Sequence, residues 1–338
     1  MTIICSQEEM EQRLVRYHEL KPCTTAFIDT RTPGSQKENF TIIGPGVAEN
    51  PDQYVHIDIP HGFNIGGVRQ EPHCINSQHS HETAEVFIVQ NSRWVFRCGV
   101  DASDGEIVLE SGDVISIPTN VFRGFENIGE EQGYMCSVLG GDDPGKVTWA
   151  PAVFDMANDY GLILLENGQL VDTTKGETIP DGSLPMPPTT QEVVNSMRNL
   201  SLEEMHGCVC TAKDLIALKS SALAKVEGIE ELPIIGDANP AEGISAGKMT
   251  WQHGFHLRCL IMAPGSTIDA HHRLEEEVIY LYEGDLDVVW QDGSLALGKG
   301  DVLTIPKQLN RTFHNSSKTT IAYVVRGGDN PAAPQWVS

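Results

Sequence analysis

The chain has 338 residues, of which 40% are hydrophobic and 21% charged, a composition typical of a folded globular protein with room for two ordinary domains. Its 47 acidic against 23 basic residues give a formal net charge of −24, which disfavours nucleic acid and anionic membrane surfaces as partners. The apolar runs are far shorter than the roughly 20 residues of a membrane span, and the N-terminus lacks the pattern of a secretory signal, so we expect a cytoplasmic protein.

The first predicted element is an amphipathic helix within residues 1–23. Ser6 and Glu9 have the spacing of a capping box, in which each side chain bonds the other residue's backbone N–H. Apolar residues such as Met10 follow at helical spacing, and Pro22 ends the pattern. We therefore expect one continuous helix before the first domain.

Two β domains and a connector are predicted for the rest of the chain. In residues 24–150, short β-branched and aromatic runs are separated by Gly, Pro, Asn and Asp. The same residue pattern, which is typical of β-strands joined by turns, recurs in residues 245–338. Residues 151–244 form a connector with helices, because its second half has apolar residues at helical spacing before a terminating Gly228. These apolar residues are Leu215, Leu218 and Val226.

The eight cysteines are scattered along the chain, and a protein of this size does not need disulfides for stability, so we expect free thiols. Only the stretch "HGCVC", with Cys208 and Cys210, gathers soft ligands. It lacks the paired CxxC spacing of zinc sites, and we assign it no site.

An internal repeat relates the two β domains. Residues 62–89 align with 254–281 without a gap, at an offset of 192 residues. The match continues between 112–127 and 300–315 at an offset of 188, which predicts a hairpin four residues shorter in the second copy.

The repeated residues resemble the two motifs of the cupin superfamily, which are a Gly, His-x-His, Glu, Gly series and a Gly, Pro, His, Asn series. The first copy matches at His79, His81, Glu85, Gly112, Pro118 and Asn127, and the second at Gly265, His271, Glu277, Gly284, Gly300, Pro306 and Asn315. The chain is similar to a bicupin, an all-β protein with two double-stranded β-helix (jelly-roll) barrels. The resemblance also implies a homo-oligomer.

A metal site is implied by the first copy of the motif. In metal-binding cupins, the two motif-one histidines, the glutamate and the motif-two histidine hold one ion. His79 and His81 lie at i and i+2 and therefore share one face of a strand, and Glu85 has the same parity. Two imidazoles and a carboxylate resemble the facial triad of non-haem iron oxygenases, so Fe(II) is favoured and Mn, Ni or Zn are alternatives.

Arginine stands at both motif-two histidine positions, Arg123 and Arg311, and cannot coordinate a metal because it stays protonated. Two interpretations follow for the first copy. Arg123 pairs with Glu85 in a metal-free barrel, or the three remaining ligands hold an ion while Arg123 acts as a catalytic residue that grips a substrate carboxylate. We favour the second interpretation.

The second copy departs further from the motif, because Arg273 replaces the second histidine. His271, Arg273, Glu277 and Arg311 predict either a buried polar network or a second anion pocket. His256 and Arg258, on a neighbouring strand, are further candidates for the same interior. We favour a structural role for this set.

The leading functional hypothesis is an iron(II) dioxygenase acting on a small, anionic, carboxylated compound, with aromatic acids included. Bicupins of about this length include gentisate-type dioxygenases, but these use three histidines and no glutamate, so the resemblance to them is distant. One alternative is a metal-dependent isomerase, lyase or hydrolase acting on a small anion. The other is a non-catalytic bicupin that binds a small ligand or has a structural role.

Overall fold

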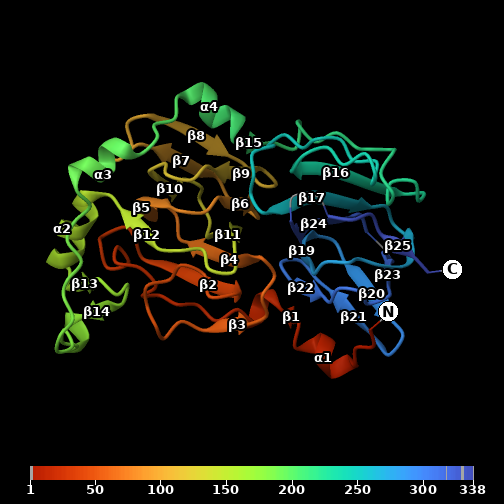
Figure 1. Cartoon of the computed structure of the whole chain (residues 1–338), viewed down its shortest axis with the longest axis horizontal. Helices are drawn as coiled ribbons and strands as arrows, with labels where there is room; N and C mark the ends of the chain where they lie inside the picture. Colours follow the sequence, from red (N-terminus) through yellow and green to blue (C-terminus); the bar gives the residue numbers. More distant parts are fainter. Residues whose placement is uncertain (1–2, 317, 329–330, 338) are drawn as a thin grey trace. The chain divides into compact units, whose positions relative to one another are not determined.

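The structure is a computed structural model that describes residues 3–316, 318–328 and 331–337. The chain divides into two compact units (Figure 1). We call the unit Lys21–Pro60 with Asn64–Val209 the first β domain. The second β domain comprises Met1–Leu20, His61–Phe63 and Cys210–Ser338. None of the described helices combines the length and the hydrophobicity that a membrane-spanning helix requires.

The first β domain is built on a seven-stranded and a five-stranded sheet. Aromatic rings from the two sheets pack together in its core, with Phe87 5.4 Å from Phe96 and 5.1 Å from Phe125 between ring centroids. The larger sheet has the order β15 (Val209–Cys210), β9 (Val114–Ile117), β6 (Glu85–Val89), β11 (Gly133–Gly140), β4 (Phe63–Gln70), β2 (Lys37–Ile43) and β3 (Val55–Ile57). The smaller has the order β12 (Val147–Trp149), β5 (Ile75–His81), β10 (Arg123–Asn127), β7 (Trp94–Cys98) and β8 (Gly105–Leu109).

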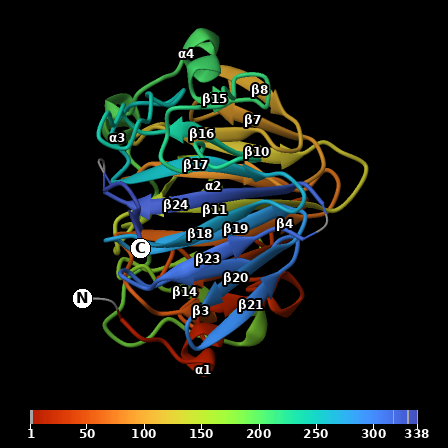
Figure 2. The same cartoon turned by 90° about the vertical axis from the view of Figure 1, so that its right-hand side faces the viewer.

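The second β domain has the same architecture, seen most directly in Figure 2. Its six-stranded sheet has the order β1 (Leu14–Val15), β22 (Val302–Ile305), β19 (Glu277–Glu283), β24 (Thr320–Gly327), β17 (Phe255–Met262) and β16 (Ile229–Ile235). Its five-stranded sheet has the order β21 (Gly293–Leu297), β20 (Leu286–Trp290), β23 (Arg311–His314), β18 (Thr267–His272) and β25 (Gln335–Trp336). Aliphatic side chains such as Ile279, Leu281 and Leu303 are fully buried in its core.

The internal repeat predicted from the sequence is confirmed strand by strand. Strands β9 and β22 are equivalent at the predicted offset of 188 residues, since they span Val114–Ile117 and Val302–Ile305. The loop between β7 and β8 has six residues, 99–104, and the loop between β20 and β21 has two, 291–292. The second hairpin is thus shorter by the four residues expected.

The prediction of one continuous N-terminal helix is wrong. Helix α1 (Gln7–Glu11) has the expected capping box between Ser6 and Glu9, but it ends after five residues. The chain then extends as β1, which pairs with β22, before a 3₁₀ turn, η1 (Tyr17–Glu19). Pairing with a buried strand satisfies the backbone of residues that local spacing assigned to a helix, so tertiary contacts outweigh propensity here.

The connector contains three short helices, α2 (Pro151–Asp159), α3 (Gln191–Ser196) and α4 (Leu202–Gly207). A hairpin, β13 (Leu162–Leu164) with β14 (Leu170–Asp172), and a 3₁₀ turn, η2 (Thr173–Lys175), follow α2.

The helix predicted between Leu215 and Val226 is not formed. The Leu218 N–H donates to the carbonyl of Glu231 in β16 at 3.0 Å, and the Ala222 N–H donates to the carbonyl of Glu242 at 3.1 Å. Long-range acceptors thus replace the i−4 carbonyls of a helix. Strand β16 itself lies within the segment that the sequence assigned to the connector.

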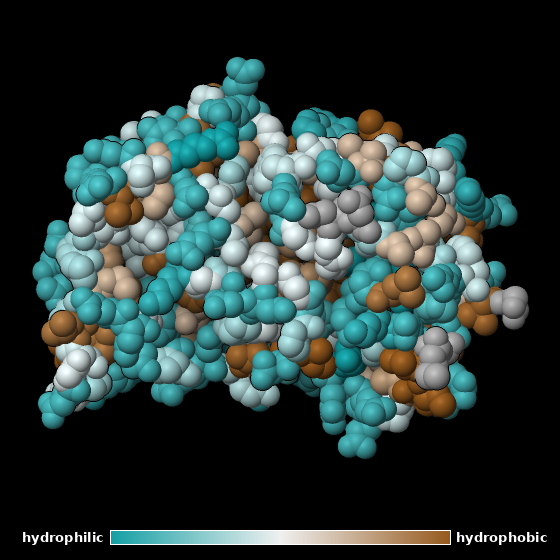
Figure 3. All heavy atoms as spheres, in the orientation of Figure 1, coloured by the Kyte–Doolittle hydropathy of each residue, from teal (hydrophilic) through white to brown (hydrophobic). Residues whose placement is uncertain are grey.

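One face of the molecule is mostly hydrophilic. On the face seen in Figure 3, hydrophilic residues predominate and apolar residues occur in small separate groups. All eight cysteines are free thiols, as predicted.

Candidate metal centre

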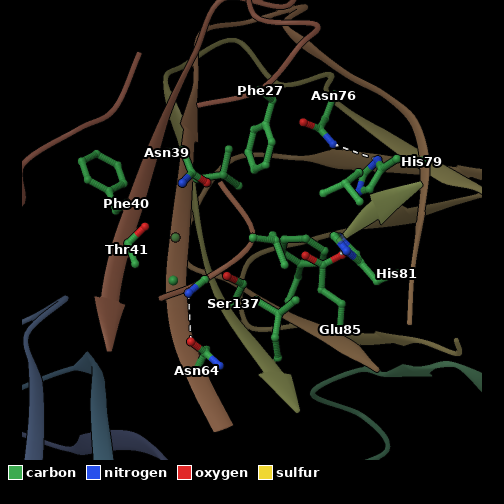
Figure 4. Close-up of a pocket in the computed structure, with 18 of the residues that line it drawn as sticks. Phe27, Asn39, Phe40, Thr41, Asn64, Asn76, His79, His81, Glu85 and Ser137 are labelled. Atoms are coloured by element: carbon green, nitrogen blue, oxygen red, sulfur yellow. Dashed lines mark hydrogen bonds and ion pairs between the residues drawn. The ribbon is translucent and has the colours of Figure 1, made fainter. Parts of the chain in front are cut away.

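The structure brings His79, His81 and Glu85 together inside the first β domain (Figure 4). Both histidines lie on β5, and Glu85 begins β6 on the facing sheet. The three side chains are 3–5% exposed, and their potential ligand atoms all lie within 4.8 Å of one another. The alternation of the strand therefore places both imidazoles in one interior, where the carboxylate meets them.

Arg123 pairs with Glu85 in this structure. It lies opposite His79 in the register between β10 and β5 and is 1% exposed. Its Nη2 donates to Glu85 Oε2 at 2.6 Å, and its Nη1 donates to the His79 carbonyl at 3.3 Å. The first interpretation, a metal-free barrel, predicted this ion pair. Binding of a substrate carboxylate by Arg123 stays a prediction.

Burial controls the protonation of the three candidate ligands. Burial, followed by the charge of Arg123, holds the pKa of His79 and of His81 well below the usual range of histidine. Both imidazoles are therefore neutral near neutral pH and keep a lone pair for a metal. Burial raises the pKa of Glu85, and the charge and hydrogen bond of Arg123 oppose that rise.

The donor atoms fit a metal ion. His79 Nδ1 lies 2.7 Å from the Ser77 carbonyl, which assigns the proton to Nδ1. His79 Nε2 therefore keeps the lone pair that a metal ion requires. His81 Nδ1 is buried without a hydrogen-bond partner among the described residues, and His81 Nε2 lies 3.5 Å from Glu85 Oε2. Donors on one ion stand about 3–4 Å apart, so shifts of about an ångström would bring all three onto it.

The three side chains face a cavity of about 50 Å³ between the two sheets. At about 10–15 Å³ per water, this space holds on the order of three to five water molecules. Its apolar wall includes Trp149, whose ring centroid is 5.3 Å from that of His79. Trp149 and Val147 lie on β12, directly opposite His79 and His81 in register.

Sequence reasoning missed the polar groups of this cavity, which are Asn39, Thr41, Asn64, Asn76 and Ser137. They come from four strands, β2, β4, β5 and β11, that only the folded sheets bring together. No motif marks them, because an isolated Asn or Ser on a strand has many structural roles.

The second β domain repeats the arrangement around Arg123. Arg311 donates through Nη2 to Glu277 and through Nη1 to the His271 carbonyl at 3.3 Å, as Arg123 does with Glu85 and His79. The difference is Arg273, whose Nη1 donates to Glu242 at 2.6 Å. The predicted set of His271, Arg273, Glu277 and Arg311 therefore lies in one buried ion-pair network.

Glu242, which the sequence did not single out, is the centre of this network. Its carboxylate also accepts from Arg258 Nη2 at 2.7 Å and from Arg326 Nη2 at 3.1 Å. The remaining partners are Glu231, 2.8 Å from Arg258, and Glu275, 2.9 Å from Arg326. Four arginines thus face four carboxylates.

Arginine fills the second interior at positions that leave the first one open. At the repeat offset, Arg273 corresponds to His81 and Arg258 to Gly66. Arg326 is paired across from Glu277 as Leu139 is paired across from Glu85. Gly66, His81 and Leu139 all line the first cavity, so long side chains occupy the equivalent space in the second domain.

The network predicts a loss of stability in acid. Burial would raise the pKa of Glu242 and of Glu277, but the neighbouring arginines outweigh it and lower both to about 2, from an ordinary value of 4.5. Burial and the charge of Arg311 lower the pKa of His271 from 6.5 to about 3. All three groups bind protons more readily in the unfolded chain, so the free energy of unfolding should fall as the pH drops below 6.5.

The fall should steepen below 4.5, where the two glutamates add to it, and continue toward about 2. Urea denaturation at a series of pH values measures this dependence. The matched variant His271→Gln should reduce the slope between 6.5 and 4.5 and leave the steeper acid limb in place. A free energy of unfolding that stays constant over the whole range would contradict the prediction.

Compared as a sequence, the chain matches no family model and no curated protein. Solved structures do match its fold. A mutant of Bacillus subtilis oxalate decarboxylase is 12% identical with a TM-score of 0.56, covering 97% of this chain and 79% of that one. Oxalate decarboxylase from Lactobacillus farciminis, in a formate complex, is 13% identical with a TM-score of 0.55, covering 96% and 88%.

Procruciferin, an 11S globulin from Brassica napus, is 11% identical with a TM-score of 0.50, covering 80% of this chain and 77% of that one. These likenesses extend over both β domains, and the chain therefore has the bicupin fold, as the sequence predicted. At such low identity they concern the fold alone.

Proposed function

We propose that this bicupin is a metal-dependent enzyme acting on a small carboxylate in its first β domain. The observation that carries the proposal is the buried His79, His81 and Glu85 cluster beside a cavity. The second β domain supports it by contrast, because its equivalent interior is filled with paired charges. The second domain then has a structural role.

The reaction class that the cavity favours is a lyase, such as a decarboxylase. A space for three to five water molecules suits a substrate of few atoms better than an aromatic acid. The similar solved structures include oxalate decarboxylases, and the one from Bacillus subtilis has Mn(II) centres. An ion held by His79, His81 and Glu85 would act as a Lewis acid toward a bound carboxylate.

The protein's own groups have distinct tasks in this proposal. Neutral imidazoles supply two nitrogen donors, and Arg123 orients Glu85 and balances its charge. The wall formed by Val147 and Trp149 restricts water at the reacting carboxylate. Should Arg123 leave Glu85 when substrate enters, it would reach the carboxylate as predicted from the sequence.

A dioxygenase remains the second candidate, because two histidines and one carboxylate are the donor set of non-haem Fe(II) oxygenases. The test is to reconstitute the protein with iron, manganese, nickel or zinc, and to assay small carboxylates for carbon dioxide release and oxygen uptake. Release without oxygen supports the lyase, and stoichiometric oxygen uptake supports the dioxygenase. A protein that holds none of the four metals would refute both and favour a non-catalytic bicupin.

The remaining expectations belong to the same proposal. They are a small anionic substrate, assembly into a homo-oligomer and a cytoplasmic location, all expected from the sequence. The net charge of −24 bears on the partners alone, because it disfavours nucleic acid and anionic membrane surfaces.

A further inference from the structure

We infer that the substrate is a monocarboxylate whose far end is neutral and hydrogen-bonding, and that Ser137 and Asn39 recognise that end. This inference rests on the proposed metal-dependent function and adds the substrate class. It starts from polar groups of the cavity that have no hydrogen-bond partner within the described part of the chain.

Ser137 stands at the right distance from the metal ligands. It lies on β11, two residues before Leu139, which is directly opposite Glu85 in register. Two residues along a strand span about 6.6 Å, so the serine lies one short molecule away from the carboxylate. Ser137 is 7% exposed, and its hydroxyl has no hydrogen-bond partner among the described residues.

Gly66 keeps the serine hydroxyl open. A Cβ added at Gly66 would lie 2.9 Å from Ser137 Oγ, and Gly66 itself lines the cavity. Any larger side chain at this position would cover the hydroxyl. In the second β domain, the equivalent positions are Arg258 and, by register, Val324, so this recognition exists only in the first domain.

Asn39 supplies the second free group. It lies on β2 in the same sheet and is among the labelled residues around the cavity in Figure 4. Its side chain makes no hydrogen bond within the described chain, whereas two polar neighbours are already engaged. Thr41 donates to Gln53, and Asn64 donates to the Gly141 carbonyl and accepts from the Gly46 N–H.

The charge of the lining selects a monoanion. None of the described residues that line the cavity is a lysine or an arginine. The positive charge of Arg123 lies at the metal end of the cavity, beside Glu85, so no cation among the described lining residues would balance a second carboxylate near Ser137. A second carboxylate near Ser137 would be buried without a counter-charge, which is costly, whereas a hydroxyl or carbonyl would pair with Ser137 and Asn39.

Three ligands of similar length test this inference on the metal-reconstituted protein: propionate, 3-hydroxypropionate and malonate. We expect 3-hydroxypropionate to bind about three- to tenfold more tightly than propionate in calorimetric titrations, since one added hydrogen bond has that typical effect. Malonate should bind no more tightly than propionate. The variant Ser137→Ala should remove the advantage of the hydroxyl and leave propionate affinity unchanged.

Ser80→Ala is the matched control, because Ser80 is also a buried serine of the first β domain but does not line the cavity. It should retain the preference for 3-hydroxypropionate. Tightest binding of malonate, or an equal loss for propionate and 3-hydroxypropionate in Ser137→Ala, would overturn the inference while the metal site stands. Metal content measured in the same samples separates the failures, since a metal-free wild type refutes the proposed function and this inference together.

Discussion

The His81→Ala protein is expected to lose its bound metal. His81 is one of only three donors that the described structure gathers, so its removal leaves one imidazole and a carboxylate already paired with Arg123. Loss of outer-shell partners alone typically weakens metal affinity 10–100-fold, and we expect loss of a ligand to exceed about 100-fold. Elemental analysis after reconstitution and dialysis measures the effect.

Two comparisons make this experiment decisive. His206→Ala removes an exposed histidine of helix α4 in the same β domain and should keep the wild-type metal content. Far-ultraviolet circular dichroism should show that His81→Ala stays folded, since the Arg123 and Glu85 pair is intact. Equal metal content in the wild-type and His81→Ala proteins would exclude His79, His81 and Glu85 as the metal centre.

The second large effect is expected from Glu242→Gln in the second β domain. This change removes the charge that balances Arg258, Arg273 and Arg326, all of which are 1–2% exposed. Breaking one partner of a buried ion pair usually destabilises a protein by about 3–5 kcal/mol, because the remaining charge is left without compensation. We therefore expect a loss of that size in urea denaturation.

An exposed ion pair is the control for this prediction. Arg93 and Glu110 are 2.9 Å apart, and both side chains are more than half exposed, at 56% and 58%. Glu110→Gln should change the free energy of unfolding by less than about 1 kcal/mol, as is typical of surface pairs. If Glu242→Gln is too unstable to purify, Glu231→Gln breaks one contact of Arg258 and should give a smaller loss. Wild-type stability of both buried variants would contradict the network's structural role.

Much of the fold was predictable because the sequence repeats it. Two copies of one glycine, histidine, glutamate and proline pattern at nearly constant offsets predicted two related β domains, and the shorter second hairpin followed from the change in offset. The errors occurred where local spacing competed with long-range pairing. Residues 14–15 form a strand because they pair with β22, and the Leu218 N–H donates to the Glu231 carbonyl. Both partners lie outside the short segments from which a helix is predicted.

The sequence by itself determined the candidate ligands. Side chains alternate along a strand, so His79, His81 and Glu85 had to share one face once the motif placed them at the ends of two strands. The same reasoning identified Arg123 and Arg311 as the residues that stand where a fourth ligand is expected.

Only the tertiary structure decided what surrounds those residues. It paired Arg123 with Glu85 and closed the second interior around Glu242. It also left the Ser137 hydroxyl, beside Gly66, without a hydrogen-bond partner among the described residues. These outcomes depend on partners that come from separate strands and, for Glu242, from outside the repeated segments. An ion pair or a cavity forms between residues of different strands, so the residue spacing within one strand cannot predict it.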